Sequence, residues 1–185
     1  MASITFLDDR TRPEPPSFEG LTPEQKLPGE HLRMIHDHLR HNMQVLARLI
    51  ERAAGGEASV EDVARETAQL DMVANYRRFG TLCGQYCLFV EAHHGIEDAA
   101  IFPRLAERSP VMKAIADRLR AEHVVVHALL EELVAALNAL VGDPTEENFA
   151  AARGVYETLA RVLLSHLGYE EEAIGDALGH YGIGI

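Results

Sequence analysis

Histidine is the residue type in this sequence that points most directly to chemistry. The chain of 185 residues contains ten histidines, and nine of them lie in four clusters between residues 31 and 166. Imidazole nitrogens and carboxylate oxygens bind transition-metal ions when several of them converge. Histidines and acidic residues on the inward face of a helix are therefore candidate metal ligands.

Seven such residues interrupt the apolar stripes of four amphipathic segments. Residues three, four and seven apart share one face of a helix. In the third segment, for example, Leu119, Val126 and Leu130 share their face with His123 and His127. Three of the segments carry an i,i+4 pair of ligand-type residues. The seven candidates are His36, His93, Glu97, His123, His127, His166 and Glu170.

A shared metal centre explains the seven polar residues together. Burying an unpaired imidazole costs roughly 1–3 kcal/mol, and an unpaired carboxylate costs more. A single His on an apolar stripe is more often a hydrogen-bonded core residue, and a Glu four residues from a His is usually a surface pair. Four stripes with the same feature favour cations, which neutralise glutamates and accept imidazole lone pairs.

Long helices must position these side chains. The composition is 47% hydrophobic and 6% aromatic, with no Trp, which favours an all-α fold. We expect an up-down-up-down four-helix bundle over residues 30–180, preceded by an extended, proline-rich arm over residues 1–29. A helical solenoid would need a sequence repeat, which the chain lacks. Helices are predicted over about 30–53, 74–108, 111–141 and 147–178, with Ser109 able to cap the third.

The positions of the candidates along the helices fit one site. If the second and third helices are antiparallel, positions 95 and 125 are level, because their midpoint is Pro110. The first and second helices do not match in this way. Residues 59–71 therefore cannot simply continue the second helix, and we expect a bend, a separate short helix or an overhang there.

Several nearby histidines are expected to lie outside the ligand set. His94 and Asp98 form a second i,i+4 pair, rotated by about 100° from the first. We expect this pair to contact the ligands from outside or to lie at the surface. His31, His38 and His41 lie away from the inward face, and we expect them to be solvated or to contact the ligands from outside.

Other residues near the site have mostly structural interpretations. Tyr86 is predicted on the inward face, as a core residue or as a residue that forms a hydrogen bond near the metal or passes electrons. Cys83 and Cys87 are four apart and form neither a disulfide framework nor a paired zinc knuckle. The residues expected to form an apolar wall that excludes water are Leu39, Phe89, Ile96, Val126 and Leu130.

The charge of the chain argues against several kinds of partner. A formal net charge of −12 and a pI near 5.2 disfavour nucleic acid, whose phosphates need a basic face, and an anionic membrane surface. The first residues lack the apolar core of a signal peptide, and no stretch is predicted to span a membrane. We expect a cytoplasmic monomer or homodimer that binds neither nucleic acid nor membrane.

Three stretches of the sequence resemble the hemerythrin, or HHE cation-binding, family. They are HHGIEDAAIFPRL from His93, AEHVVVH ending at His127, and HLGYEEE from His166, and the resemblance covers about residues 30–175. It implies one iron bound by His123, His127 and His166, a second bound by His36 and His93, and bridging by Glu97 and Glu170. In the family the last carboxylate can be an Asp five residues after its His, and here Glu171 and Glu172 are adjacent to Glu170.

The ligand set that the resemblance implies leaves room for a small ligand. With an oxo or hydroxo bridge, the first of the two iron ions has six donors and the second has five, so O2, peroxide, azide or NO could bind at the open position. Five of the seven ligands would be neutral imidazoles, so this site would have fewer anionic ligands than the carboxylate-rich di-iron oxygenases. Fewer anionic ligands favour reversible binding or mild redox chemistry.

Two classes of function follow, and the sequence does not choose between them. One is O2 binding, sensing or storage. The other is a di-iron enzyme that decomposes peroxide, reduces NO or carries out another small-molecule oxidation. A third reading, an iron donor, would need a labile site. The ligand set would be the same in each case.

Overall fold

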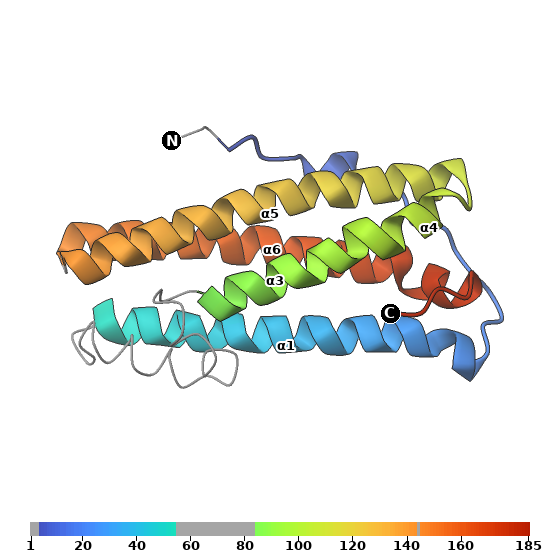
Figure 1. Ribbon diagram of the computed structural model, residues 1–185, viewed down its shortest axis with the longest axis horizontal. Coiled ribbons are helices and arrows are strands. Elements are labelled where there is room, and N and C mark those ends of the chain that lie inside the picture. Colours follow the sequence, from blue (N-terminus) through green and yellow to red (C-terminus); the bar gives the residue numbers. More distant parts are fainter. Residues whose placement is uncertain (1–3, 55–83, 144) are drawn as a thin grey trace. The chain divides into compact units, whose positions relative to one another are not determined.

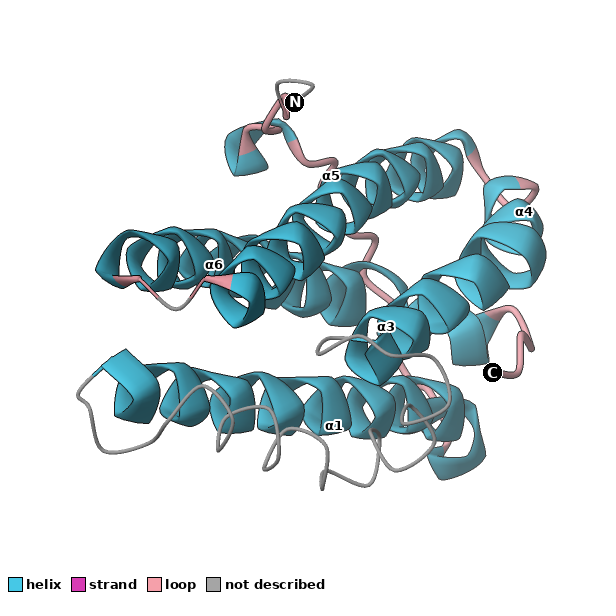
Figure 2. Ribbon diagram, turned by 60° about the vertical axis from the view of Figure 1, so that its left-hand side comes forward, coloured by secondary structure: helices cyan, strands magenta, loops and turns pink. Residues whose placement is uncertain are grey.

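The protein is helical throughout the part of the chain that the structure describes. The computed structural model describes residues 4–54, 84–143 and 145–185. Its long helices are α1 (Pro23–Ala54), α3 (Gly84–Ile96), α5 (Pro110–Gly142) and α6 (Glu146–His180), labelled in Figure 1. A π turn, η3 (Glu97–Ile101), joins α3 to α4 (Phe102–Ala106), and a short 3-10 turn, η1 (Asp9–Thr11), precedes α1. Figure 2 shows helices and loops but no strand among the described residues, so the all-α prediction is confirmed.

The chain divides into two compact units. The first comprises Met1–His38, His93–Val126 and Leu163–Ile185, and the second comprises Leu39–Ala92 and His127–Val162. In the first unit, segments of α1, α5 and α6 and the stretch that contains η3 and α4 enclose an apolar core. Fully buried members of that core are Leu32, Phe102, Leu105, Ile115, Leu119 and Ile174.

Helix α1 begins at Pro23 because the residues before it cap a helix. The Thr22 N–H donates to Gln25 Oε1 at 2.9 Å, and the Gln25 N–H donates to Thr22 Oγ1 at 3.3 Å. This reciprocal pair is a capping box, and proline is favourable at the first helical position. The expectation of extended chain up to residue 29 is therefore wrong for residues 23–29.

The other predicted helix boundaries agree closely with the structure where it describes them. Helix α5 spans Pro110–Gly142, and the Met112 N–H donates to Ser109 Oγ at 3.1 Å, so the predicted cap is confirmed. Helix α6 ends near Gly182, whose φ is +64°, and the Ile183 N–H donates to the Leu178 carbonyl oxygen at 2.8 Å. This is the hydrogen bond of a Schellman motif. The predicted start of the second helix and residues 59–71 lie outside the described residues.

The π turn interrupts the α-helical hydrogen bonds between α3 and α4. The Phe102 N–H donates to the Glu97 carbonyl oxygen, five residues earlier. Pro103 has no N–H to donate to the Ala99 carbonyl oxygen, and its ring crowds that oxygen. The ordinary i to i−4 pattern therefore cannot continue here, and single π turns of this kind are frequent at functional sites.

Helices α1 and α6 approach each other backbone to backbone in the first unit. A Cβ atom on Gly29 would lie 2.6 Å from the Gly175 carbonyl oxygen. A Cβ atom on Gly179 would lie 1.4 Å from the Gln25 carbonyl oxygen. Only glycine permits this approach, which fixes the start of α1 against the end of α6.

One helix among the described residues, over Pro110–Leu140, is long and apolar enough to cross a membrane by length and composition alone. An apolar stretch within this helix has a mean hydropathy of 1.5. The prediction that no stretch could span a membrane is therefore wrong by length and composition. However, 44% of that apolar stretch is buried inside the protein. The helix also carries Glu122, His123, Glu131 and Glu132, and ionisable residues are costly within a bilayer. Core helices pass the same test, so this feature alone is weak support for a membrane span.

Candidate metal centre

Seven buried side chains in the first unit form two groups that could hold metal ions. One group contains three histidines and the other contains two histidines and two glutamates, and within each group the ligand atoms lie within 4.8 Å of one another. None of the seven side chains is more than 7% exposed. The three-histidine group is His94, His123 and His166, and the second group is His36, His93, Glu97 and Glu170.

The two carboxylates lie close to both groups of histidines. Glu97 Oε1 is 3.2 Å from His93 Nε2, and Glu97 Oε2 is 3.8 Å from His123 Nε2. Glu170 Oε2 is 3.6 Å from His36 Nε2 and 3.4 Å from His166 Nε2. First-row metal ions bind nitrogen and oxygen at about 2.0–2.2 Å, so two donors of one ion lie about 3 Å apart or slightly more. The spacing suits carboxylates that bridge two ions.

Buried polar atoms without hydrogen bonds test whether the residues fit a metal. Both carboxylate oxygens of Glu97, both of Glu170 and Nε2 of His166 are buried and make no hydrogen bond with acceptable geometry within the described part of the chain. Leaving such atoms unsatisfied costs roughly 1–3 kcal/mol each, and more for charged groups. In addition, His36 Nε2 lies 3.1 Å from His93 Nε2, a separation expected for two donors of one cation. The residues therefore fit a metal centre.

In three of the histidines, the ring nitrogen that faces away from the donor groups contacts a carboxylate oxygen. Nδ1 of His36 lies 2.8 Å from Glu171 Oε1, and Nδ1 of His123 lies 3.1 Å from Asp98 Oδ1. Nδ1 of His166 lies 3.0 Å from Glu122 Oε2. An Nδ1–H that donates to a carboxylate leaves the Nε2 lone pair free to bind a metal and fixes the ring.

The pKa values of the metal-free site reflect burial and crowding of like groups. Burial lowers the pKa of His93 to about 4, so this ring is neutral at pH 7 and can donate a lone pair. Burial also lowers the pKa of His123. Burial and the neighbouring carboxylate of Glu170 raise the pKa of Glu97 well above its ordinary value. Burial alone would raise the pKa of Glu170 too, but the close approach and charge of His166 lower it.

Six of the seven residues predicted from the sequence lie in these groups. His127 is the exception: it is half-buried, belongs to the second unit, and is in neither group of the described residues. Its ligand role stays a prediction. His94, expected at the surface or outside the ligands, is fully buried within the three-histidine group, which excludes the surface position. Asp98 contacts Nδ1 of His123, which agrees with the prediction that it contacts a ligand from outside the donor groups.

The difference at His94 comes from the rotation of the helix about its axis. The inward positions are Val90, His93, His94, Glu97 and Ile101. As far as Glu97 these follow ordinary three- and four-residue spacing, and the centre of the face lies between the two adjacent histidines. Ile101 lies at the end of the π turn. An inward face drawn through Phe89 and Ile96 is displaced from this one. Phe89 is 38% exposed and Ile96 is 58% exposed, so their expected place in the apolar wall is wrong, whereas the other three wall residues are buried.

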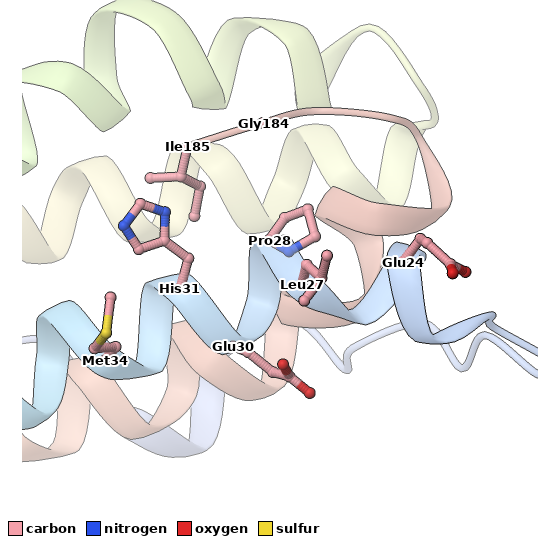
Figure 3. Close-up of a pocket in the computed structure, with 8 residues that line it drawn as sticks. All are labelled: Glu24, Leu27, Pro28, Glu30, His31, Met34, Gly184 and Ile185. Carbon is pink, nitrogen blue, oxygen red and sulfur yellow. The ribbon is translucent and has the colours of Figure 1, made fainter.

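The remaining histidines and the other predicted residues lie away from the donor groups. His31, His38 and His41 are exposed, as expected for solvated residues. The structure does not describe the side chain of Tyr86, so its predicted roles stay predictions. A pocket of about 590 Å³ at the start of α1 and the C-terminus, shown in Figure 3, is lined by His31 and Met34 among others and contains none of the seven donors.

Over the described residues, the helices and donor groups define a helical protein with a buried site suited to metal ions. The family model for the Hemerythrin HHE cation binding domain matches residues 27–178. The chain therefore belongs to this family, and the resemblance in the sequence is confirmed. No curated protein and no solved structure matches the chain.

Proposed function

We propose that this chain is a non-haem di-iron protein that binds O2 or a related small ligand, such as peroxide or NO, for oxygen binding, sensing or storage. The helices would form an up-down-up-down four-helix bundle in a cytoplasmic protein. One iron would be held by His94, His123 and His166, and the other by His36 and His93. Glu97 and Glu170 would bridge the two ions. This assignment replaces His127 of the sequence interpretation with His94.

The observation that carries the proposal is the composition of the two donor groups. Five imidazoles and two carboxylates are buried in two groups, and within each group the ligand atoms lie within 4.8 Å of one another. Nitrogen and oxygen donors in this ratio suit iron in the ferrous and ferric states, and membership of a family defined by cation binding supports the same conclusion. Bound iron would supply the redox-active centre at which a small ligand is held.

The unequal numbers of histidines favour ligand binding at one of the two positions. If both glutamates bridge, the ion held by His36 and His93 has one protein donor fewer than its neighbour. The exposed fractions agree with this, because His93 at this ion is 7% exposed whereas the three histidines at the other ion are at most 1% exposed. A site this enclosed would admit diatomic or similarly small ligands and exclude larger substrates.

Iron analysis combined with absorption spectroscopy tests the proposal. The purified protein is loaded with iron(II) under anaerobic conditions, its iron content is measured, and it is then exposed separately to O2, peroxide and NO. We expect about two irons per chain and an O2-dependent absorption band that disappears when O2 is removed. A chain that retains no iron would overturn the di-iron assignment. Rapid catalytic loss of peroxide or NO without a stable O2 adduct would favour the enzyme alternative.

A further inference from the structure

The N-terminal segment reaches the carboxylate behind one of the candidate ligands. We propose that Arg12 is a positioning residue of the metal centre: it holds Glu122 in the orientation in which Glu122 accepts a hydrogen bond from His166 Nδ1. Residues 8–13 are part of the predicted N-terminal arm, and from here on the arm means these six residues. Docking of the arm thereby keeps His166 Nε2 turned toward the donor groups. The role in metal binding rests on the proposed function, whereas the contacts themselves do not.

Arg12 and Glu122 form a two-pronged ion pair. Arg12 Nε lies 2.9 Å from Glu122 Oε1, and an Arg12 terminal nitrogen lies 3.0 Å from Glu122 Oε2. The same Oε2 accepts from His166 Nδ1 at 3.0 Å. Planar guanidinium groups match carboxylates in this bidentate geometry, which fixes direction as well as distance. Arg12 therefore helps to fix the position of the Glu122 carboxylate and, through it, the orientation of the His166 ring.

Burial makes this pair more consequential than a surface ion pair. The Arg12 side chain is 15% exposed and the Glu122 side chain is 6% exposed. Burial alone would raise the pKa of Glu122, but hydrogen bonds from His166, Arg12 and Arg118 lower it to about 2. Glu122 is thus a fixed anion at neutral pH. Arg118 also donates to Glu122 Oε1, so loss of Arg12 would leave one guanidinium where two now hold the carboxylate.

The arm has its own anchors, which bring Arg12 to this place. A second terminal nitrogen of Arg12 donates to Ser165 Oγ at 2.9 Å, and Ser165 Oγ donates to Asp9 Oδ2 at 2.6 Å. The Tyr169 hydroxyl donates to the Pro13 carbonyl oxygen at 2.9 Å, and the Arg12 guanidinium lies 4.7 Å from the centre of the Tyr169 ring. Ser165 and Tyr169 flank His166 on α6, so the arm contacts the helix at the level of the ligand.

Coupling between the arm and the site must act in both directions. If arm docking favours the ligand orientation of His166, metal binding must favour arm docking by the same factor. The bond between Arg10 and Thr11 lies in the arm and is a trypsin site, whereas Arg12 is followed by proline. Metal loading should therefore slow cleavage after Arg10 in the wild-type protein.

A metal-independent experiment tests the positioning step. In metal-free protein, the His166 Nδ1–H proton should give a downfield NMR signal that exchanges slowly with water at fixed pH. We expect Arg12→Gln to speed this exchange about tenfold, Glu122→Gln to remove the protected signal, and the double variant to resemble Glu122→Gln alone. Arg10→Gln is the matched control, because the Arg10 side chain is 89% exposed and pairs with Asp8. An unchanged His166 signal in Arg12→Gln would overturn the proposal, whatever happens to the melting temperature.

The metal-dependent experiment measures loss of iron(II) to the chelator ferrozine. Residues that orient metal ligands typically contribute 10–100-fold to metal affinity, and we expect about tenfold faster iron loss from Arg12→Gln. Arg12→Lys keeps the charge but not the bidentate contact, and it should lie between wild type and Arg12→Gln. Equal rates in Arg12→Gln and Arg10→Gln would refute a role in metal retention. If wild-type protein retains no iron, the di-iron proposal fails instead, and the NMR experiment still decides whether Arg12 positions His166.

Discussion

Glu97 and Glu170 face opposite requirements with and without metal. Both side chains are fully buried, and each lies within 3.8 Å of histidine nitrogens from both donor groups. Cations between the two carboxylates would neutralise them. Without metal the carboxylates crowd each other, and burial together with Glu170 raises the pKa of Glu97. The residues that suit metal binding therefore destabilise the metal-free protein.

Replacing Glu97 with Gln should separate metal binding from stability. The amide keeps the size of the side chain but removes a buried, poorly solvated acid, so we expect metal-free Glu97→Gln to be more stable than metal-free wild type by about 1 kcal/mol. The same substitution should abolish tight binding of two irons. Urea unfolding of the chelated proteins and iron analysis of the loaded proteins measure the two effects. Reduced stability without metal, or full iron content, would contradict this account of Glu97.

The stability difference between these two proteins should grow with pH. Below the ordinary Glu pKa of 4.5, Glu97 carries its proton in both the folded and the unfolded chain and contributes no difference. As the pH rises above 4.5, the unfolded chain ionises while the folded chain keeps its proton, so the free energy of unfolding of wild type falls. Glu97→Gln lacks this term. Unfolding of metal-free protein at pH 4 and pH 7 should show a larger advantage for the variant at pH 7.

The structure and the sequence assign different histidines as the fifth imidazole ligand: the structure indicates His94, and the sequence resemblance implies His127. Substitutions at these two residues test which assignment is correct. His94 is fully buried in the three-histidine group, whereas His127 is half-buried and outside both groups. We expect His94→Ala to lose most of the bound iron and His127→Ala to retain nearly two per chain. Iron content after gel filtration decides between them. The opposite result would restore the ligand set inferred from the sequence.

At the scale of the helices, spacing predicted which segments carry ligands better than it predicted their rotation. Adjacent His93 and His94 cannot be distinguished by a three- or four-residue rule when each has an acid four residues later. Because Ile96 is apolar, the predicted inward face was centred too close to it, although its side chain is 58% exposed. The rotation is seen in the burial of Val90 and Ile101, which depends on neighbouring helices and not on local sequence.

Helix ends were predictable where their signal is local. The sequence alone predicts that Ser109 can cap the third helix, and Ser109 Oγ accepts a hydrogen bond from the Met112 N–H. The capping box of Thr22 and Gln25 is equally local, but the prolines in this part of the sequence led to the prediction of an extended chain. By contrast, nothing in the spacing of Arg12 indicated its contact with Glu122, because the two residues are 110 positions apart. Such long-range pairs require the folded chain.

The close approach of α1 and α6 predicts a strong effect of a single methyl group. A Cβ atom at Gly179 would meet the Gln25 backbone, so Gly179→Ala must push the helices apart, and we expect it to lower the free energy of unfolding by about 1–3 kcal/mol. Gly154→Ala is the control, because a Cβ atom there has nothing within 4 Å. On an exposed helical position it should raise stability by about 0.5–1 kcal/mol. Urea unfolding measures both, and equal effects would argue against backbone contact at Gly179.

At the scale of the whole molecule, metal binding and folding should be linked. All seven donors belong to one compact unit, but they come from residues as far apart as 36 and 170. An unfolded chain cannot hold them together, so metal binds the folded state and stabilises it by mass action. The same unit buries a continuous apolar core, which indicates that the helices can persist when the metal is removed.

Chelation should therefore lower the melting temperature without removing the helices. For free metal at about 1,000 times Kd the stabilisation is roughly 4 kcal/mol, which corresponds to a shift on the order of 10 °C for a chain of this size. Circular dichroism of wild type with and without chelator measures both the helix content and the melting temperature. In His166→Ala the chelator should have little further effect, because the ion has already lost a ligand. Equal melting temperatures of loaded and chelated wild type would mean that the donors bind no ion tightly, and complete loss of helix on chelation would mean that the apolar core cannot hold the first unit together.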